Sequence, residues 1–284
     1  MNIIEKAISL RDAAKRTEVA QAKVAVPRGK GPSGAPRAVG TRIEPARFGR
    51  LMDLGMLPDT ECDQLLIEQL RHLKRPVLQN SFGPLSEETA NVVMITSARP
   101  GAGKTFVSAS LAYALTRERE LSVVIVDLDN IRATLTKGLD LSDRVGFFDA
   151  ADDPEISLES LLVPTEIPGL RIIPTGRQTQ DSAELLSSAR ARQLLGALSD
   201  DDPTRIIILD TPPLLVTPDA HAILELSHQI ILVVEAGVTK QSDMRQILGS
   251  IHGDKPVGLV LNKAAGGLMS TYGGDYYASG YNVP

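Results

Sequence analysis

The stretch NVVMITSARPGAGKTF, residues 91–106, decides the fold of this chain. Its apolar run at 92–95 predicts a buried strand, residues 97–103 predict a loop, and a helix is expected from Lys104 onward. Such a turn converges backbone N–H groups at a helix N-terminus, so the stretch predicts a phosphate-binding loop. Lys104 would reach the outer phosphates of a nucleotide, and the Thr105 hydroxyl would reach a magnesium ion. The residues predicted to bind nucleotide here are Gly101, Ala102, Gly103, Lys104, Thr105 and Phe106.

The loop departs by one position from the G-x-x-x-x-G-K-[ST] pattern, because Ala98 stands where the first glycine would be. An ordinary strand, turn and helix with a surface lysine is the competing interpretation. The combination of these turn residues with these flanking elements favours the phosphate-binding loop.

Strand and helix signals alternate along the rest of the chain. Apolar runs predict strands at 92–95, 123–126, 170–173, 206–209, 230–234 and 257–261. Helices are predicted at 60–75, 104–117, 182–198, 217–226 and 239–251, with helical turns at 130–137 and 155–162. Pro76 is expected to end the first helix. The alternation predicts an α/β fold whose mostly parallel sheet carries helices on both faces. Together with the phosphate-binding loop, it indicates a P-loop NTPase.

Three aspartates follow predicted strands. Asp127 and Asp129 lie at the end of SVVIVDLDN, and Asp210 ends the apolar run of RIIILDTPPLL. Ligands of parallel α/β sheets bind at the carboxyl ends of the strands, so these carboxylates are expected near the loop. A nucleoside triphosphate brings Mg²⁺, which prefers oxygen ligands. Aspartate is also a common turn residue, which is the alternative for each position taken singly.

The composition excludes several classes of protein. With 284 residues, 43% of them hydrophobic, the chain can bury one substantial α/β core. The single cysteine, Cys62, excludes an internal disulfide, and no apolar run reaches the ~18 residues of a membrane span, so a cytoplasmic protein is expected. Tryptophan is absent and aromatic residues make up 4%, which argues against a nucleic-acid partner.

Both ends of the chain differ in composition from the middle. Residues 1–50 hold eleven Lys and Arg against four Asp and Glu, which predicts a basic, helical or flexible arm. Such an arm could contact anionic lipid or an acidic partner, or be a solvated tether. The predicted organisation is this arm at 1–50, a P-loop domain with a leading helix at 51–265, and a flexible tyrosine-rich tail at 266–284.

The tail contains most of the tyrosines of the chain. Four of the five, Tyr272, Tyr276, Tyr277 and Tyr281, are separated there by Gly, Ser, Ala and Asp. Such a segment has too few apolar residues to form a core. A phenol hydroxyl is a nucleophile that a P-loop site could direct at a γ-phosphate, so the four are predicted phosphoacceptors. A tail that docks a partner without being modified is the alternative.

Together these motifs resemble those of the bacterial tyrosine autokinases of polysaccharide export. In that family a P-loop is followed by a strand ending in D-x-D, here VVIVDLDN, and by a strand ending in D-x-P-P, here IIILDTPP. The resemblance covers roughly residues 61–284 and includes the tyrosine-rich end. It implies an ATP- and Mg²⁺-dependent kinase that phosphorylates its own tail and regulates exopolysaccharide synthesis, export and chain length.

The resemblance also implies roles for single residues. Asp127 would assist deprotonation of the incoming tyrosine, although the division of roles between Asp127 and Asp129 stays open. Asn262 stands where related ATPases contact the base, and a turn-forming asparagine is the alternative. The implied catalytic residues are Lys104, Asp127, Asp129 and Asp210. The implied magnesium ligands are Thr105, Asp127 and Asp210.

The family further implies partners. The segment IEQLRHLKRP resembles its E-x-x-R-x-x-R oligomerisation motif, which makes Glu68, Arg71 and Lys74 candidate residues of a homo-oligomeric ring interface. Glu68 and Arg71 could equally form a local helical pair. The implied activator is a separate membrane-spanning chain-length regulator, which would hold the protein at the inner face of the cell membrane.

Two other functions fit parts of the sequence. A positioning or partitioning ATPase of the deviant-Walker class shares the fold. That class, however, carries a lysine where this chain has Arg99, a glycine where it has Pro100, and no tyrosine tail. A nucleotide-switched adaptor without catalysis is the second alternative, and the intact loop and strand-end aspartates argue against it.

Overall fold

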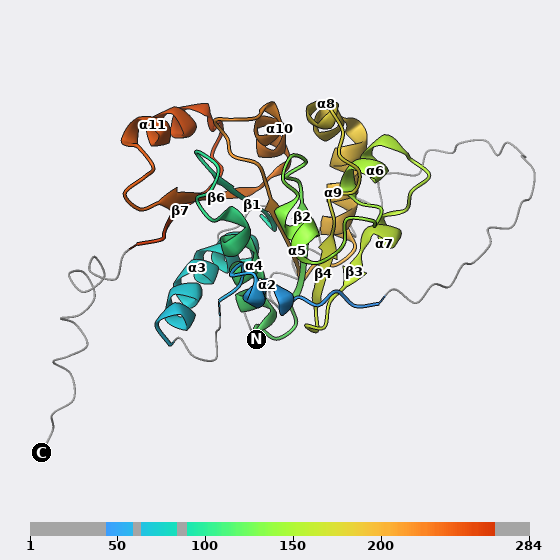
Figure 1. Ribbon diagram of the computed structural model, residues 1–284, viewed down its shortest axis with the longest axis horizontal. Helices are drawn as coiled ribbons and strands as arrows, with labels where there is room; N and C mark the ends of the chain where they lie inside the picture. The colour runs from blue at the N-terminus through green and yellow to red at the C-terminus, as the bar shows by residue number, and fades with distance from the viewer. Residues whose placement is uncertain (1–43, 59–63, 84–89, 265–284) are drawn as a thin grey trace, which may run out of the picture.

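The computed structural model describes residues 44–58, 64–83 and 90–264 of the 284-residue chain (Figure 1). Its centre is a seven-stranded sheet with the order β3-β4-β2-β5-β1-β6-β7. Neighbouring strands are parallel except β3 and β4, which confirms the predicted mostly parallel sheet. The two-residue β3 is too short to carry a sequence pattern. The strands are β1 (Val92–Ser97), β2 (Ser122–Asp127), β3 (Val163–Pro164), β4 (Leu170–Ile173), β5 (Arg205–Asp210), β6 (Gln229–Glu235) and β7 (Val257–Asn262).

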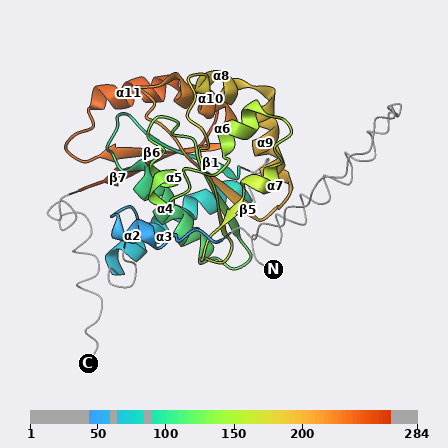
Figure 2. The ribbon, with the colours of Figure 1, turned by 45° about the vertical axis from the view of Figure 1, so that its right-hand side comes forward.

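Helices cover both faces of the sheet, as predicted (Figure 2). Successive side chains of β1 point to opposite faces, so Val93 packs into one core and Met94 into the other. The first face is covered by α2 (Arg50–Asp53), α3 (Gln64–Phe82), α4 (Lys104–Thr116) and α5 (Thr134–Gly138). The second is covered by α6 (Phe147–Asp152), α7 (Leu158–Leu161), α8 (Ser182–Ser187), α9 (Ala189–Asp200), α10 (Pro218–Leu226) and α11 (Gln241–Ser250).

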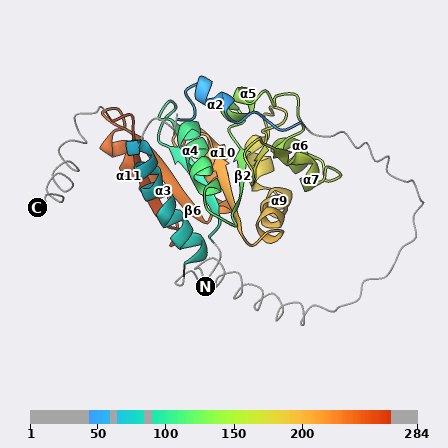
Figure 3. The ribbon, with the colours of Figure 1, turned by 90° about the horizontal axis from the view of Figure 1, so that it is seen from below.

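The helix α3 continues through Phe82, beyond the proline that the sequence pattern predicts as its end. A proline removes one backbone hydrogen bond from a helix. Val77 and Phe82 nevertheless pack into the core beneath α3, with 2% and 3% of their surfaces exposed. Apolar packing after Pro76 therefore keeps the chain helical, and the predicted stop was wrong. Figure 3 shows α3 lying alongside α4 on this face.

The segment predicted as one helix at 182–198 forms two helices, α8 and α9. They meet at Ser188, whose backbone is extended with ψ of 158°. The Ser188 hydroxyl accepts a hydrogen bond from the Ala191 N–H at 3.1 Å and so caps α9. Apolar periodicity does not reveal this break. A serine in the middle of an amphipathic run indicates it, because serine can cap the start of a new helix.

The folded domain begins before the predicted boundary at residue 50. Ala46 forms a bridge with Thr165, beside β3, and Phe48 is fully buried. The Glu166 carboxylate accepts hydrogen bonds from the N–H groups of Phe48 and Gly49 at 2.5 and 2.6 Å. Residues 44–50 are therefore fixed to the loop that follows β3.

Several predictions concern residues outside the described ranges. The basic arm before residue 44 is one of them, and the tail with Tyr272, Tyr276, Tyr277 and Tyr281 is another. Within the described ranges, no helix combines the length and the apolar character that a bilayer crossing requires.

Candidate active site

Two aspartates lie side by side where β2 and β5 end. Asp127 and Asp210 are aligned partners in the parallel ladder, and both are buried. Thr105 Oγ1 donates a hydrogen bond to Asp210 Oδ2 at 2.8 Å, and Ser108 Oγ donates to Asp210 Oδ1 at 3.1 Å. The end of β5 is therefore linked directly to the first turns of α4, the helix that follows the loop.

Asp127 is held by α5 and by its own loop. Its Oδ2 accepts hydrogen bonds from Thr136 N at 2.9 Å and from Thr136 Oγ1 at 2.8 Å. Its Oδ1 accepts a hydrogen bond from Asp129 N at 3.2 Å. Thr136 Oγ1 also lies 3.1 Å from Thr175 Oγ1, in the loop after β4. Both carboxylate oxygens of Asp127 are thus engaged within the protein.

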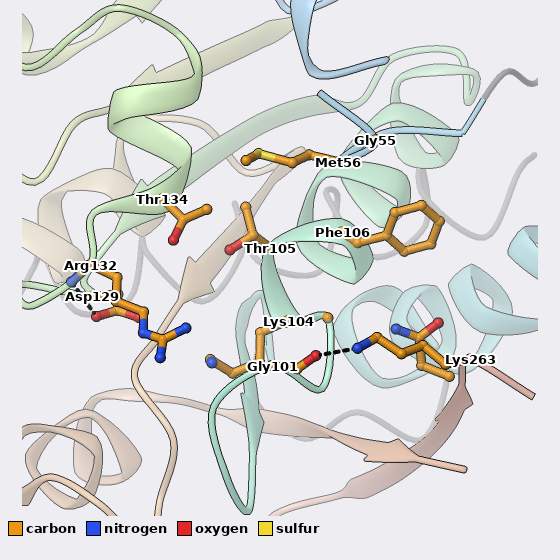
Figure 4. Close-up of a pocket in the computed structure, with 12 residues that line it drawn as sticks. Gly55, Met56, Gly101, Lys104, Thr105, Phe106, Asp129, Arg132, Thr134 and Lys263 are labelled. Carbon is orange, nitrogen blue, oxygen red and sulfur yellow. Dashed lines mark hydrogen bonds between the residues drawn. The ribbon is translucent and has the colours of Figure 1, made fainter. Parts of the chain in front are cut away.

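Asp129 lines the pocket in front of these strand ends. Its Oδ1 accepts a hydrogen bond from Arg132 N at 3.0 Å, which fixes the turn that brings Arg132 to the pocket wall. In Figure 4 the guanidinium group of Arg132 points towards the amine of Lys104. Of the two aspartates in D-x-D, Asp129 therefore faces the pocket, and Asp127 lies behind it.

Burial shifts the charge state of the site. Burial, followed by repulsion from Asp127, raises the pKa of Asp210 to about 7. Burial also raises the pKa of Asp127 to about 6. Burial lowers the pKa of Lys104, and the nearby Arg132 lowers it further. The charged forms of these groups are held away from water, so a ligand of complementary charge would stabilise them.

The loop before α4 has a backbone shape that glycine permits. Gly101 and Gly103 have φ values of +92° and +94°, in the left-handed region. A Cβ atom on Gly103 would lie 2.2 Å from Asn262 Nδ2, so a side chain there would displace Asn262. The missing side chain lets the loop approach the end of β7 closely.

Two side chains at the end of β7 hold the loop in place. Asn262 Nδ2 donates a hydrogen bond to Ala102 O at 2.8 Å, and Lys263 Nζ donates to Gly101 O at 2.7 Å. Lys263 Nζ also forms an ion pair with Glu235 Oε1 at 3.0 Å. Lys263 belongs to no predicted motif, although its place beside Asn262 after a strand is a signal that indicates it.

These residues enclose a pocket of about 460 Å³ at the carboxyl ends of the strands (Figure 4). Of the predicted set, it is lined by Gly101, Gly103, Lys104, Thr105, Phe106, Asp129 and Asn262. It is also lined by residues that the sequence analysis does not predict: Gly55, Met56, Arg132, Thr134 and Lys263. The predicted residues Ala102, Asp127 and Asp210 are buried outside this lining. Gly55 and Met56 are distant in sequence from the other lining residues, so no local motif predicts their place in the pocket.

The donors of the site fit a magnesium ion that arrives with a nucleotide. Thr105 and Asp210 bring two hard oxygen donors together. Across residues 44–58, 64–83 and 90–264, no three His, Cys, Asp or Glu side chains gather to hold a metal by themselves. A magnesium ion that arrives with a nucleotide would share its coordination with phosphate oxygens, and Lys104 and Arg132 would balance the remaining phosphate charge.

The predicted interface residues on α3 are engaged within the chain. Arg71 Nη1 and Glu68 Oε2 lie 2.9 Å apart, with side chains 64% and 53% exposed. Lys74 Nζ lies 2.6 Å from Glu118 Oε1, and its side chain is 16% exposed. The structure thus contains the local Glu68–Arg71 pair, and the ring interface stays a prediction.

Comparison with known sequences places this site in context. Residues 93–278 match the family described as the CobQ/CobB/MinD/ParA nucleotide binding domain. The tyrosine-protein kinase ptk of Acinetobacter johnsonii is 29% identical over 212 residues, which cover 74% of this chain and 28% of that protein. The tyrosine-protein kinase YwqD of Bacillus subtilis strain 168 is 26% identical over 234 residues, which cover 81% of this chain and 94% of that protein.

Solved structures give the same result. The kinase domain of the Escherichia coli tyrosine kinase ETK superposes with a TM-score of 0.63 at 25% identity, covering 81% of this chain and 87% of that chain. The comparisons confirm the predicted P-loop fold and the predicted resemblance to bacterial tyrosine kinases. The chain spans 28% of the length of the Acinetobacter relative and 94% of the Bacillus relative.

Proposed function

This chain belongs to the CobQ/CobB/MinD/ParA nucleotide-binding family, and we propose that it is an ATP- and Mg²⁺-dependent tyrosine autokinase that regulates exopolysaccharide synthesis or export. The observation that carries the proposal is the convergence of Lys104, Arg132 and Asp129 on one pocket beside the glycine loop. Two cations suit the phosphates of a nucleotide, and an adjacent carboxylate suits a hydroxyl nucleophile. Relatives named as tyrosine-protein kinases support it.

In this proposal the loop and its neighbours bind and orient the nucleotide. Lys104 and the loop amides would hold the phosphates, while Thr105 and Asp210 would hold the cation. When bound, Mg·ATP supplies the γ-phosphoryl group and a cation that balances its charge during transfer. Phe106 and Asn262, on the β7 side of the pocket, would contact the base.

We assign Asp129 to the incoming tyrosine, in place of Asp127. Asp127 is fully buried and both its oxygens accept hydrogen bonds, whereas Asp129 lines the pocket. A carboxylate within hydrogen-bond reach accepts the phenol proton as the hydroxyl oxygen attacks. The tyrosine oxygen then bonds to the γ-phosphorus, the bond from that phosphorus to the bridging oxygen breaks, and ADP leaves. Asp127 would anchor the loop that positions Asp129.

The proposed acceptors and partners rest on the resemblance to the bacterial tyrosine autokinases. The proposed acceptors are Tyr272, Tyr276, Tyr277 and Tyr281. A neighbouring subunit of a homo-oligomeric ring would present its tail to the pocket. Glu68 and Arg71, which pair with each other within one chain, are exposed on α3 and would exchange this pair for contacts across such an interface. The proposed activator is a membrane-spanning chain-length regulator, which would recruit the protein to the inner face of the membrane.

The proposal is tested by incubating the full chain with Mg·ATP and mapping phosphotyrosine by mass spectrometry. We expect phosphotyrosine within residues 272–281. Lys104→Ala should lower the rate of phosphotyrosine formation by about 100-fold or more, because the buried Lys104 ammonium would stabilise the charge that develops on the phosphates in the transition state. Lys240→Ala is the matched control, since Lys240 is exposed and outside the pocket lining.

The same experiment separates the alternatives. Steady ATP hydrolysis without phosphotyrosine would indicate a positioning ATPase, and nucleotide binding with neither reaction would indicate an adaptor. The structure gives an argument against the positioning ATPase. Arg99, at the place of that class's loop lysine, pairs with Asp243 of α11 at 2.7 Å. Its guanidinium group is therefore committed to a neighbour within the chain.

A further inference from the structure

An apolar groove of about 750 Å³ lies between α3 and β7, next to the active-site pocket. Leu70, Leu73 and Val77 line it from α3, and the whole of β7 lines it from the sheet. α3 packs mainly against α4, which leaves this space between α3 and the end of the sheet. Phe106 and Lys263 line both the groove and the pocket, so the two cavities are neighbours.

The strand beside this groove presents different side chains to the two faces of the sheet. Val260, the ladder partner of Val233, packs with the core on the α3 face, whereas Leu259, the ladder partner of Leu232, lies on the face of α10 and α11 and is 60% exposed. β7 is the last strand of the sheet, and the described part of the chain places no further strand beyond it. An edge strand offers unpaired backbone groups, and the apolar lining of the groove beside it leaves room for a further apolar segment.

The C-terminal part of the chain departs from this groove. Ala264, the last described residue, lines it together with Lys263. Lys263 has a φ of +58°, so the backbone turns at the end of β7, and Gly266 and Gly267 permit a reversal shortly afterwards. The first described residues lie instead beside β3, at the opposite edge of the sheet from β7 (Figure 1).

The composition of residues 265–271 suits the groove. This segment, AGGLMST, has no charged side chain, and its large apolar residues are Leu268 and Met269. Among the described residues that line the groove, only His72 and Lys263 are titratable. The basic residues 1–50, with eleven Lys and Arg, would instead bring many cations to an apolar surface.

We propose that residues 265–271 fold back into this groove and place Leu268 and Met269 between α3 and β7. The five residues after Ala264, which end at Met269, reach roughly 17 Å when extended, and this suits the roughly 20 Å length of β7. The docked segment runs from the active-site end of β7 towards its other end. Tyr272 then leaves the groove at the end that faces away from the pocket of its own chain.

This docking has a consequence that rests on the proposed function. With the tail held in the groove, its tyrosines are kept from their own pocket and are presented to a neighbouring subunit. The docking itself requires no phosphoryl transfer. A failure of the docking test and a failure of the kinase test are therefore distinguishable.

Disulfide trapping in the full chain tests the proposal. Leu73→Cys and Met269→Cys are introduced together with Cys62→Ser, the protein is oxidised gently, and the products are separated on a non-reducing gel. We expect a bridge within one chain, confirmed by mass spectrometry of the linked peptides. In the matched control, Glu159→Cys replaces Leu73→Cys, because Glu159 is an exposed residue of α7 far along the sheet. The control pair should bridge at least about tenfold more slowly, in line with the difference in effective concentration.

Three results would overturn the proposal: no bridge, equal bridging in the control, or bridges only between two chains. The last would show that a second copy occupies the groove.

Hydrogen exchange gives an independent measurement that leaves the folded domain unaltered. Replacing Leu268 and Met269 with Asp in the full chain should expose the groove and speed amide exchange in the part of α3 at residues 70–77 and in β7. Exchange in β2, which lies away from the groove, should not change. Equal exchange in α3 and β7 of both proteins would contradict the proposal.

Discussion

The two sides of the phosphate-binding loop differ in how their charged groups are compensated. The carboxylate side lies at the ends of β2 and β5, and the β7 side lies at the end of β7. On the carboxylate side, Asp127 and Asp210 lie buried together. Burial raises the pKa of both carboxyl groups, and the charge of Asp127 raises the pKa of Asp210 further. On the β7 side, Lys263 is paired with Glu235 and Asn262 bonds to the loop backbone, so charges and polar groups are satisfied internally. A bound cation would therefore stabilise the first side, whereas the hydrogen bonds of the second side hold the shape of the loop without one.

The largest expected effect on the rate of phosphotyrosine formation comes from a substitution of Asp129, on the carboxylate side. Asp129→Asn should lower the initial rate of phosphotyrosine formation by about 10²-fold or more, because the phenol proton loses its acceptor. The melting temperature should stay near that of the parent protein. Thr136→Val, which removes the hydroxyl that donates to Asp127, should instead destabilise the fold by about 1–3 kcal/mol. Full activity in Asp129→Asn would return the proton-acceptor role to Asp127.

The pH dependence of stability comes next in size. An unfolded Asp loses its proton near pH 3.9, whereas burial raises the pKa of Asp210 in the folded protein to about 7. Between these values the native state holds more protons, so the free energy of unfolding falls as pH rises from about 4 to 7. For Asp210 alone this fall is up to about 4 kcal/mol, from 1.36 kcal/mol per pKa unit.

Urea unfolding without nucleotide at pH 5 and pH 8 measures this effect. Asp210→Asn should be less sensitive to pH than the parent protein, and Mg²⁺ with nucleotide should restore stability at pH 8 in the parent. Identical pH profiles for the parent and the variant would show that charging the buried Asp210 does not lower the free energy of unfolding.

A smaller effect is expected on the β7 side. Lys263→Met removes the charged donor to Gly101 O, so the loop should be less ordered and the KM for ATP should rise about tenfold, with kcat within about twofold. Lys263→Arg should restore part of the affinity. Steady-state kinetics of phosphotyrosine formation measures both constants, and a fall in kcat at unchanged KM would show that Lys263 acts on the transferred group instead.

The smallest effect is expected outside both sides, at Arg99. Its side chain is 63% exposed and pairs with Asp243, so Arg99→Ala should change the rate of phosphotyrosine formation by less than about twofold. A loss of about 100-fold would indicate that Arg99 contacts a phosphate, as the loop lysine does in the positioning ATPases.

The sequence predicts the carboxylate side well because strand ends and ligands coincide there. An apolar run marks each strand, and a parallel sheet brings all carboxyl ends to one edge, so the sequence predicts Asp127, Asp129 and Asp210 close together. Asp127 and Asp210 are neighbours in the ladder of the structure. Sequence does not reveal which aspartate is covered. That depends on Thr136 of α5, which folds over Asp127 and leaves Asp129 at the surface of the pocket.

Other parts of the molecule depend on long-range packing and escape local patterns. Pro76 is a helix stop in isolation, yet Val77 and Phe82 gain enough burial to carry α3 past it. Met56 reaches the pocket from a segment that shares no motif with the loop. Lys263 follows a strand as many turn residues do, and only the approach of the loop to β7 gives its amine an acceptor.

The attachment of the first described residues to the loop after β3 has a mechanical consequence. A pull on residue 44 would load the Ala46 N–H bond to Pro164 O, and then the two hydrogen bonds from Phe48 and Gly49 to Glu166. Gly55 and Met56, which line the pocket, come after this clamp in the chain. Tension transmitted from upstream would therefore have to break the hydrogen bonds to Pro164 and Glu166 before it could move Gly55 and Met56 and open the pocket.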